Sequence, residues 1–123
     1  MHNPGLVELY DINATALVGT EGMGQASHRT GCTDMGDVSH IIPTIHPYAG
    51  GATGTSHGSD YLIKDYQVAV INPAKAMAMM VIDLLADGAA KAKEVIANSK
   101  PDMTRQKYVS FMGSQIKEEE YDS

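Results

Sequence analysis

The first part of the chain carries apolar side chains at helical spacing. Asn3-Pro4 is a typical helix start, because Asn can cap and Pro fits the first helical position. The side chains that then share one face are those of Leu6, Leu9, Tyr10, Asn13 and Leu17. This pattern predicts one amphipathic helix from Pro4, ended by Gly19, Gly22 and Gly24.

The middle of the chain alternates glycine-rich and β-branched stretches. Residues 38–42 and 44–46 read as one strand interrupted at Pro43, which places it at an edge or a bulge. Residues 24–37 and 49–60 read as loops, and Tyr61-Leu62-Ile63 as a brief extended segment.

The strongest helical pattern follows Asn72-Pro73, which repeats the helix-start signal. Residues 74–86, AKAMAMMVIDLLA, are apolar nearly all round, so we expect this helix to be well buried and its methionines to fill the core. Asp87-Gly88 breaks the pattern. Residues 89–98 predict a further helix, stopped by Lys100-Pro101, and residues 107–112 give a weak strand signal.

These elements predict an α/β chain with few strands packed by helices. One or two strands cannot form a satisfactory sheet alone, and a helix as apolar as 73–86 needs something to cover it. We therefore expect the chain to be a piece of a larger α/β domain or to assemble with partners, self-association included.

Composition narrows the functional classes. With 123 residues, 43% apolar and 20% charged, the chain is typical of one soluble domain or part of one. The net charge of −6 argues against a nucleic-acid surface. No apolar run approaches the roughly 18 residues of a membrane span, and Met1–Gly5 is no signal peptide, so no membrane partner is expected. The single Cys excludes an internal disulfide and fits the cytoplasm.

Candidate chemistry is concentrated between Gly31 and His57. Carboxylates and imidazoles, the side chains that bind and polarise a hydrolytic metal, stand here between glycine-rich turns. The members are Cys32, Asp34, Asp37, His40, His46 and His57. The pattern is typical of the mouth of an active site, although it does not make up a whole one.

Each member has a plainer interpretation beside the functional one. His57, in a polar loop, is a surface or a functional residue, and Asp60 could orient its ring. Asp34 and Asp37 either form turns around Gly36 or line a site. His46 could line a pocket or be a satisfied half-buried side chain, whereas His40 alternates with apolar residues and reads as structural. Cys32 has no basic neighbour to activate it as a nucleophile.

Taken together, these residues resemble a known family. Cys-Thr-Asp-Met-Gly-Asp-Val-Ser at 32–39 is similar to the S-T-D-x-G-D/N-V-S motif of the co-catalytic zinc amidohydrolases of peptidase family M-twenty, with Cys32 where the family usually has Ser. Pro43–Tyr48 matches the Pro-x-Ile-His-Pro-Tyr that follows in the branch of aminobenzoyl-glutamate hydrolases, N-acyl-amino-acid amidohydrolases and β-alanyl-dipeptidase-like members. A metal-ligand histidine on a flexible loop aligns with His57, and a long Ala/Met-rich helix with 73–86.

The resemblance implies the C-terminal part of the catalytic domain of a zinc aminopeptidase/carboxypeptidase-like fold. Residues 1–101 would belong to that domain, and 102–123 would be a partly disordered extension. The remaining metal ligands, the general-base glutamate and the lid would lie in a missing N-terminal part, which is the expected partner. The fragment alone would contain no catalytic residue and is expected to be inactive.

The resemblance also implies roles for residues of this sequence. His57 would hold one of two Zn²⁺ ions, which the fragment alone would not retain tightly, and a metal-activated water would attack the amide of an N-acyl amino acid or small dipeptide. Asp37 and Asp60 would orient the residues that contact the metal or the substrate, without contacting either themselves. The substrate would be bound by Thr33, Asp34, His46, Gly50 and Gly51. The alternative is a free-standing ligand-binding or interaction module without catalysis.

Overall fold

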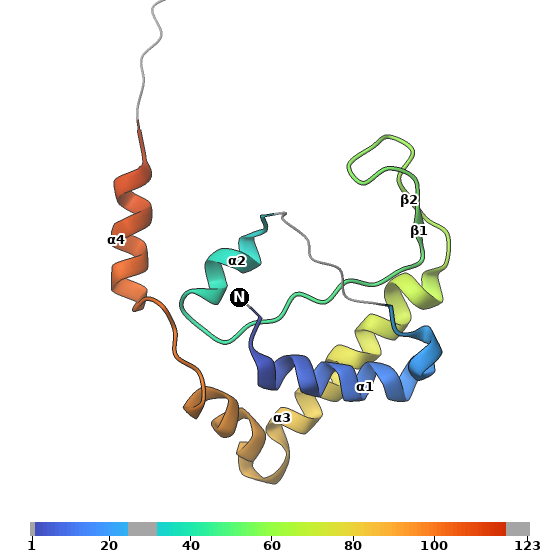
Figure 1. The fold of residues 1–123 in the computed structure, drawn as a ribbon, viewed down its shortest axis with the longest axis horizontal. Coiled ribbons are helices and arrows are strands. Elements are labelled where there is room, and N and C mark those ends of the chain that lie inside the picture. The colour runs from blue at the N-terminus through green and yellow to red at the C-terminus, as the bar shows by residue number, and fades with distance from the viewer. Residues whose placement is uncertain (1, 25–31, 118–123) are drawn as a thin grey trace, which may run out of the picture.

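The structure, a computed structural model, describes residues 2–24 and 32–117. It is mixed and mostly helical, with one small two-stranded sheet (Figure 1). The predicted loop at 24–37 and the predicted extension at 102–123 fall partly outside these residues. Because the described residues contain both helices and a small sheet, they are compatible with the predicted α/β class, although most of them are helical.

Helix α1, Pro4–Gly22, begins where the sequence predicts. The side chain of Asn3 accepts a hydrogen bond from the Leu6 N–H at 3.1 Å, which caps the first turn, and Pro4 occupies a position that needs no N–H. The helix is kinked at Gly19, where φ is 70°. Helix start and end are therefore confirmed.

Helix α3, Asn72–Ala97, is also confirmed, but the helical backbone starts earlier than predicted. A π-helical segment, η1 at Gln67–Ile71, leads directly into it. Pro73 has no N–H to donate, and the wider π turn before it lets the backbone continue through the proline. The predicted break is present, because Ala86 to Ala89 leave helical geometry and Asp87, Gly88 and Ala89 all have positive φ.

Two predicted strands are wrong. Residues 34–39 form a short helix, α2 (Asp34–Ser39), so the predicted loop is also wrong at 34–37, and residues 40–50 form no strand. The β-branched pattern at 38–46 meets no described strand with which it could pair, and a strand without a partner leaves its backbone groups unpaired. Residues 107–112 lie in helix α4, Arg105–Gln115, whose first turn is capped by the Thr104 hydroxyl accepting from the Lys107 N–H at 3.2 Å.

The small sheet is a hairpin of β1, Ala52–Thr53, and β2, Leu62–Ile63. The strands are antiparallel, with Ala52 opposite Ile63 and Thr53 opposite Leu62. The predicted extended segment at 61–63 is therefore confirmed, and the predicted loop at 49–60 is the first strand and tip of this hairpin.

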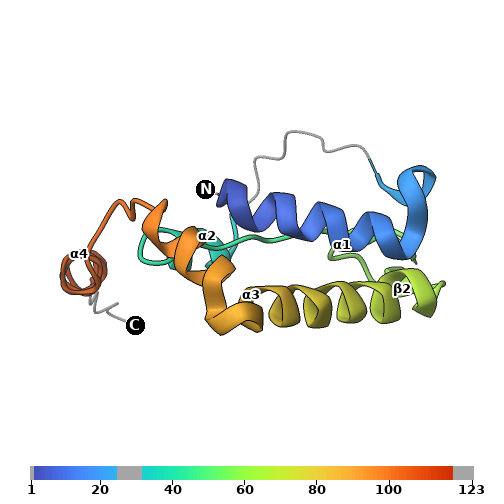
Figure 2. The same ribbon diagram turned by 90° about the horizontal axis from the view of Figure 1, so that it is seen from below.

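The core lies between α1 and α3, which run alongside each other (Figure 2). The buried apolar side chains are Leu9, Ala14, Ala76, Met80 and Val95. Buried Asn13 donates from its amide to the Asp83 carboxylate at 2.7 Å, so this polar contact between the two helices is satisfied. The two helices thus form the packed body of the described chain.

The prediction that residues 73–86 are well buried is wrong for most of them, because only Ala76 and Met80 are buried. Met80 is 7% exposed on the side of α1, whereas Met77 is 55% exposed. Val81, Ile82 and Leu85 are exposed as well. Within the described residues, the helical stretch 67–97 is long and apolar enough to cross a membrane by length and composition alone, a test that core helices of soluble proteins also pass.

Candidate functional site

The two parts of the candidate motif meet at the start of α2. Thr33 precedes the helix, and its Oγ1 lies 3.3 Å from Nδ1 of His46, within hydrogen-bond distance. The His46 ring stacks on Tyr48 with ring centroids 5.1 Å apart. The structure therefore brings together two of the predicted substrate-binding residues, from segments that the sequence separates by 13 positions.

Asp34 and Asp37 occupy the first turn of α2, and both are exposed. Carboxylates are favourable there because the first N–H groups of a helix carry partial positive charge. The Gly36 N–H donates to the Thr33 carbonyl at 2.8 Å, which closes the turn that holds both aspartates. This placement accounts for them as helix-start residues and leaves both carboxylates open to solvent.

His57 lies at the tip of the β1–β2 hairpin, exposed and with a φ of 64°. Left-handed backbone is uncommon for residues other than glycine, although His adopts it more readily than most. The turn is closed by the Gly58 N–H donating to the Thr55 carbonyl at 2.7 Å. The tip therefore presents the imidazole outward.

Asp60 serves the same tip. Its two carboxylate oxygens each lie 3.2 Å from the Thr55 N–H, which donates to them. The carboxylate thus stabilises the turn backbone beneath His57. Asp60 was predicted to orient the His57 ring; the hydrogen bonds it makes here hold the turn backbone instead.

Gly50 and Gly51 lie where the chain enters the hairpin. The Gly51 carbonyl accepts from the N–H groups of Lys64 and Asp65 at 2.8 and 2.9 Å. Gly51 has φ of 88°, and a Cβ there would lie 2.6 Å from the Asp65 carbonyl oxygen, so this position requires glycine. A Cβ at Gly50 would make only an ordinary contact, 3.6 Å from Val68.

The hairpin tip and α2 lie apart in the described part of the molecule. Both views place α2 towards one end of the long axis and the hairpin towards the other (Figures 1 and 2). The described residues contain no group of three or more His, Cys, Asp or Glu side chains that could hold a metal ion. His57 by itself offers one ligand, and a catalytic zinc site takes three from protein, so the described residues alone do not fit a metal centre.

The sequence did not reveal a contact made by His40. Its Nδ1 lies 3.3 Å from the Asp102 carboxylate, and its carbonyl accepts from the Met103 N–H at 3.0 Å. Both partners lie more than sixty residues along the chain, so no local pattern predicts the pairing. His40 therefore links the end of α2 to the segment that leads into α4.

The Tyr108 phenol of α4 lies within electrostatic reach of Asp34 and Asp37 on α2. Desolvation raises its pKa above the ordinary value, and the negative charges of Asp37 and Asp34 raise it further. Helix α4 thus comes close enough to α2 for their charges to interact.

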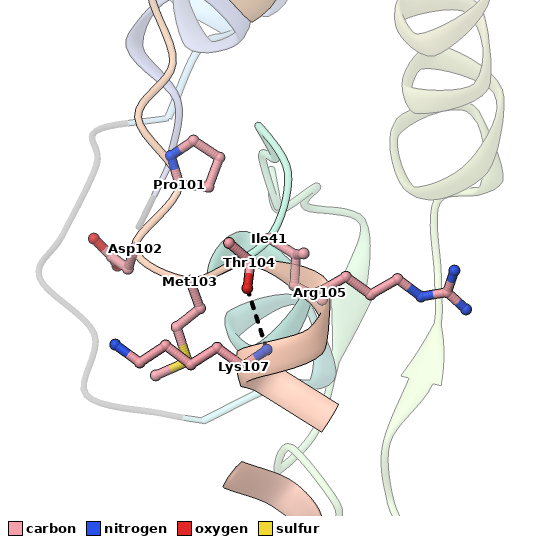
Figure 3. Close-up of a pocket in the computed structure, with 7 residues that line it drawn as sticks. All are labelled: Ile41, Pro101, Asp102, Met103, Thr104, Arg105 and Lys107. Atoms are coloured by element: carbon pink, nitrogen blue, oxygen red, sulfur yellow. Dashed lines mark hydrogen bonds between the residues drawn. The ribbon is translucent and has the colours of Figure 1, made fainter. Parts of the chain in front are cut away.

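An open hollow of about 630 Å³ lies between the residue that follows α2, Ile41, and the segment that leads into α4 (Figure 3). It is lined by Ile41, Pro101, Asp102, Met103, Thr104, Arg105 and Lys107. The Arg105 and Lys107 side chains extend in different directions, so they do not converge on one ligand (Figure 3). None of the predicted site residues lines it, and the predicted pocket around His46 is not this hollow.

Comparison with known proteins adds no assignment. No protein-family model matches the chain, and neither the curated proteins nor the solved structures give a match.

Proposed function

We propose that this chain is the C-terminal part of a metal-dependent amidohydrolase that cleaves N-acyl amino acids or small dipeptides. The proposal depends on the motif residues at 32–39, 43–48 and 57, which together resemble that enzyme family. The observation that carries it is the 3.3 Å approach of Thr33 to His46, because two segments expected to border one substrate lie side by side.

His57 would supply one imidazole ligand from the hairpin tip. Its exposure supports this role, since a ligand that completes a centre built by other residues must be accessible to them. The tip also holds this histidine at positive φ, where glycine would be less strained. The metal, when bound, would supply an activated water at neutral pH.

The substrate would be recognised beside α2. The Thr33 hydroxyl and the His46 imidazole present hydrogen-bonding groups at one exposed surface. These groups suit the carbonyl and carboxylate oxygens of an N-acyl amino acid. Asp34 and Asp37 would repel a carboxylate, so that end of the substrate would lie away from them.

The test is a pair of histidine variants in the intact protein that the gene encodes. We expect His57→Ala to lower zinc content and nearly abolish hydrolysis of an N-acyl amino acid, because one metal ligand is lost. His40→Gln is the matched control, since His40 is a histidine with an exposed contact outside the proposed centre, and it should retain both.

Two results would refute the proposal. One is full activity of His57→Ala in the intact protein. The other is an intact protein that neither binds zinc nor hydrolyses any N-acyl amino acid or dipeptide, which would favour a binding module. The 123-residue chain alone, with zinc added, should hydrolyse nothing.

A further inference from the structure

Helix α3 is interrupted by four residues in a costly backbone conformation. Ala86 is extended. The next three residues, Asp87, Gly88 and Ala89, have φ of 49°, 66° and 62°. Positive φ costs glycine little, but in any other residue it brings the Cβ too close to the following carbonyl oxygen. Ala89 therefore bears the largest cost, since Asp adopts this conformation more readily than Ala.

The residues on both sides of the break favour an uninterrupted helix. They are rich in alanine, with lysine, leucine and methionine among the others, all of which have high helix propensity. Gly88 is the poorest helix former in the break, and a helix tolerates an isolated glycine. Local preference alone would thus join residues 72–97 into one straight helix. Instead residues 90–97, the arm, turn away from the line of residues 72–85 (Figures 1 and 2).

Contacts with other elements hold the arm in its bent position. Val95 is only 7% exposed, and its Cγ2 would lie 3.3 Å from a Cβ at Gly5, so it packs directly on the backbone at the start of α1. The segment that follows the arm is fixed as well, because the Met103 N–H donates to the His40 carbonyl at 3.0 Å. Tertiary contacts therefore oppose the local preference for a straight helix.

A straight α3 would lose the contact on α1. The two helices run in opposite directions, and Asn13 lies beside Asp83 (Figure 2). Gly5 is eight residues from Asn13, about 12 Å along α1, whereas Val95 is twelve residues from Asp83, about 18 Å along a straight helix. Straightening would carry Val95 roughly 6 Å past Gly5. The bent and straight arrangements therefore exclude each other.

We propose that residues 86–89 are a hinge between two forms of α3. In the bent form Val95 packs on α1 and the hinge is strained, and in the straight form residues 72–97 make one continuous helix and Val95 is exposed. Straightening would also open the contact between Met103 and His40, so the hinge couples α3 to α2. Strain that persists only where surrounding contacts impose it is typical of switch regions. The proposal does not depend on the amidohydrolase assignment.

The distance between positions 77 and 96 distinguishes the two forms. Nineteen residues of straight helix place their Cα atoms about 28 Å apart, and a bend at 86–89 brings them closer. Met77 and Ile96 are 55% and 66% exposed, so spin-labelled cysteines can replace them in a Cys32→Ser background of the full chain. Double electron–electron resonance should show mainly the short distance in this labelled parent.

Two neighbouring substitutions move the equilibrium in opposite directions. Gly88→Ala puts a Cβ at positive φ and removes the poorest helix former, so it should raise the ratio of straight to bent about thirtyfold or more. Hydrogen exchange at the Met103 amide should become faster in this variant. Ala89→Gly relieves the strain of the bent form and should raise the melting temperature by roughly 2–4 °C. The two variants exchange the same residue types, so each is the control for the other.

The contact at Val95 is tested from the α1 side, without a change in α3. Gly5→Ala would place a methyl group 3.3 Å from Val95, so it should weaken this contact and raise the straight population about threefold. Gly113→Ala is the matched control, because a Cβ at this other helical glycine would meet nothing within 4 Å. It should leave the distance distribution unchanged.

Several results would overturn the proposal. One is a short distance that persists in Gly88→Ala, and another is a broad distribution with loss of helical circular dichroism, which would show that the arm unfolds. Lower thermal stability of Ala89→Gly would contradict the strain, and equal effects at Gly5 and Gly113 would contradict the role of Val95. Unchanged exchange at Met103 would overturn the coupling to α2. Failure here leaves the zinc and hydrolysis tests of His57→Ala unaffected.

Discussion

The α1–α3 pair and helix α4 are attached to the molecule in different ways. The pair buries apolar side chains and one internally satisfied polar contact, that of Asn13 with Asp83. Helix α4 has no buried residue, and it stands apart from α1 and α3 in both views (Figures 1 and 2). The segment leading into it is tied to α2 by the His40 carbonyl and by an exposed His40–Asp102 pair.

The difference shows where the stability of this chain is located. Burying an apolar side chain is worth about 1.5–3 kcal/mol, whereas an exposed ion pair contributes about 0–1 kcal/mol. Loss of a contact in the α1–α3 pair should therefore destabilise the whole molecule, while loss of one at α4 should release only that helix.

The largest effect is expected at Met80. Met80→Ala removes a side chain that is 7% exposed between α1 and α3 and should lower the free energy of unfolding by about 2–4 kcal/mol. Met77→Ala is the matched control, because the same side chain is 55% exposed three positions earlier. Denaturant titration at a concentration where the chain is monomeric measures both, and equal losses would contradict the comparison.

A smaller and local effect is expected at Thr104. Thr104→Ala removes the hydroxyl that accepts from the Lys107 N–H and should destabilise α4 by about 1 kcal/mol. Hydrogen exchange should become about fivefold faster in residues 105–110 and stay unchanged in α1 and α3. Ser114→Ala, which removes a hydroxyl from the other end of the helix, should change exchange much less. Faster exchange throughout the chain would show that α4 is coupled to the packed pair.

The smallest effect concerns the approach of α4 to α2. Desolvation and the charges of Asp37 and Asp34 raise the pKa of Tyr108, so the folded chain favours the neutral phenol. This contribution is present below the ordinary tyrosine pKa and is lost as pH rises through the folded-state pKa. Tyrosinate absorbance, with Tyr108→Phe to identify the signal, should show a lower pKa for Tyr108 in the double variant Asp34→Asn, Asp37→Asn. An unchanged pKa would mean that α4 does not face these carboxylates.

The sequence predicted the elements whose signals are local. Asn3-Pro4, Asp87-Gly88 and Lys100-Pro101 set helix boundaries through caps, left-handed backbone and missing N–H groups, which depend on a few neighbouring residues. The predicted strands at 38–46 and 107–112 failed because β structure depends on a pairing partner, which no local pattern reveals. Thr104 is a typical N-cap residue and could have marked the start of α4, but the weak strand signal at 107–112 was followed instead.

In the candidate site, too, contacts between residues far apart in the sequence were the ones that could not be predicted. Thr33 and His46 were predicted to bind the substrate; the structure places them 3.3 Å apart, and their role in binding stays a prediction. The assignment of His57 to a metal stays a prediction, since the described residues place it apart from α2. The partners of His40 could not be predicted, because Asp102 and Met103 join it across more than sixty residues.

The contrast between Gly50 and Gly51 has a consequence for how this chain can vary. Any other L-amino acid at position 51 would collide with the Asp65 carbonyl, whereas alanine at position 50 meets only open or ordinary surroundings. Substitutions should therefore be tolerated at Gly50 and should be rare at Gly51. A methyl group at position 51 would force the hairpin away from η1 and change the direction in which His57 points. The packed pair of α1 and α3 would stay folded.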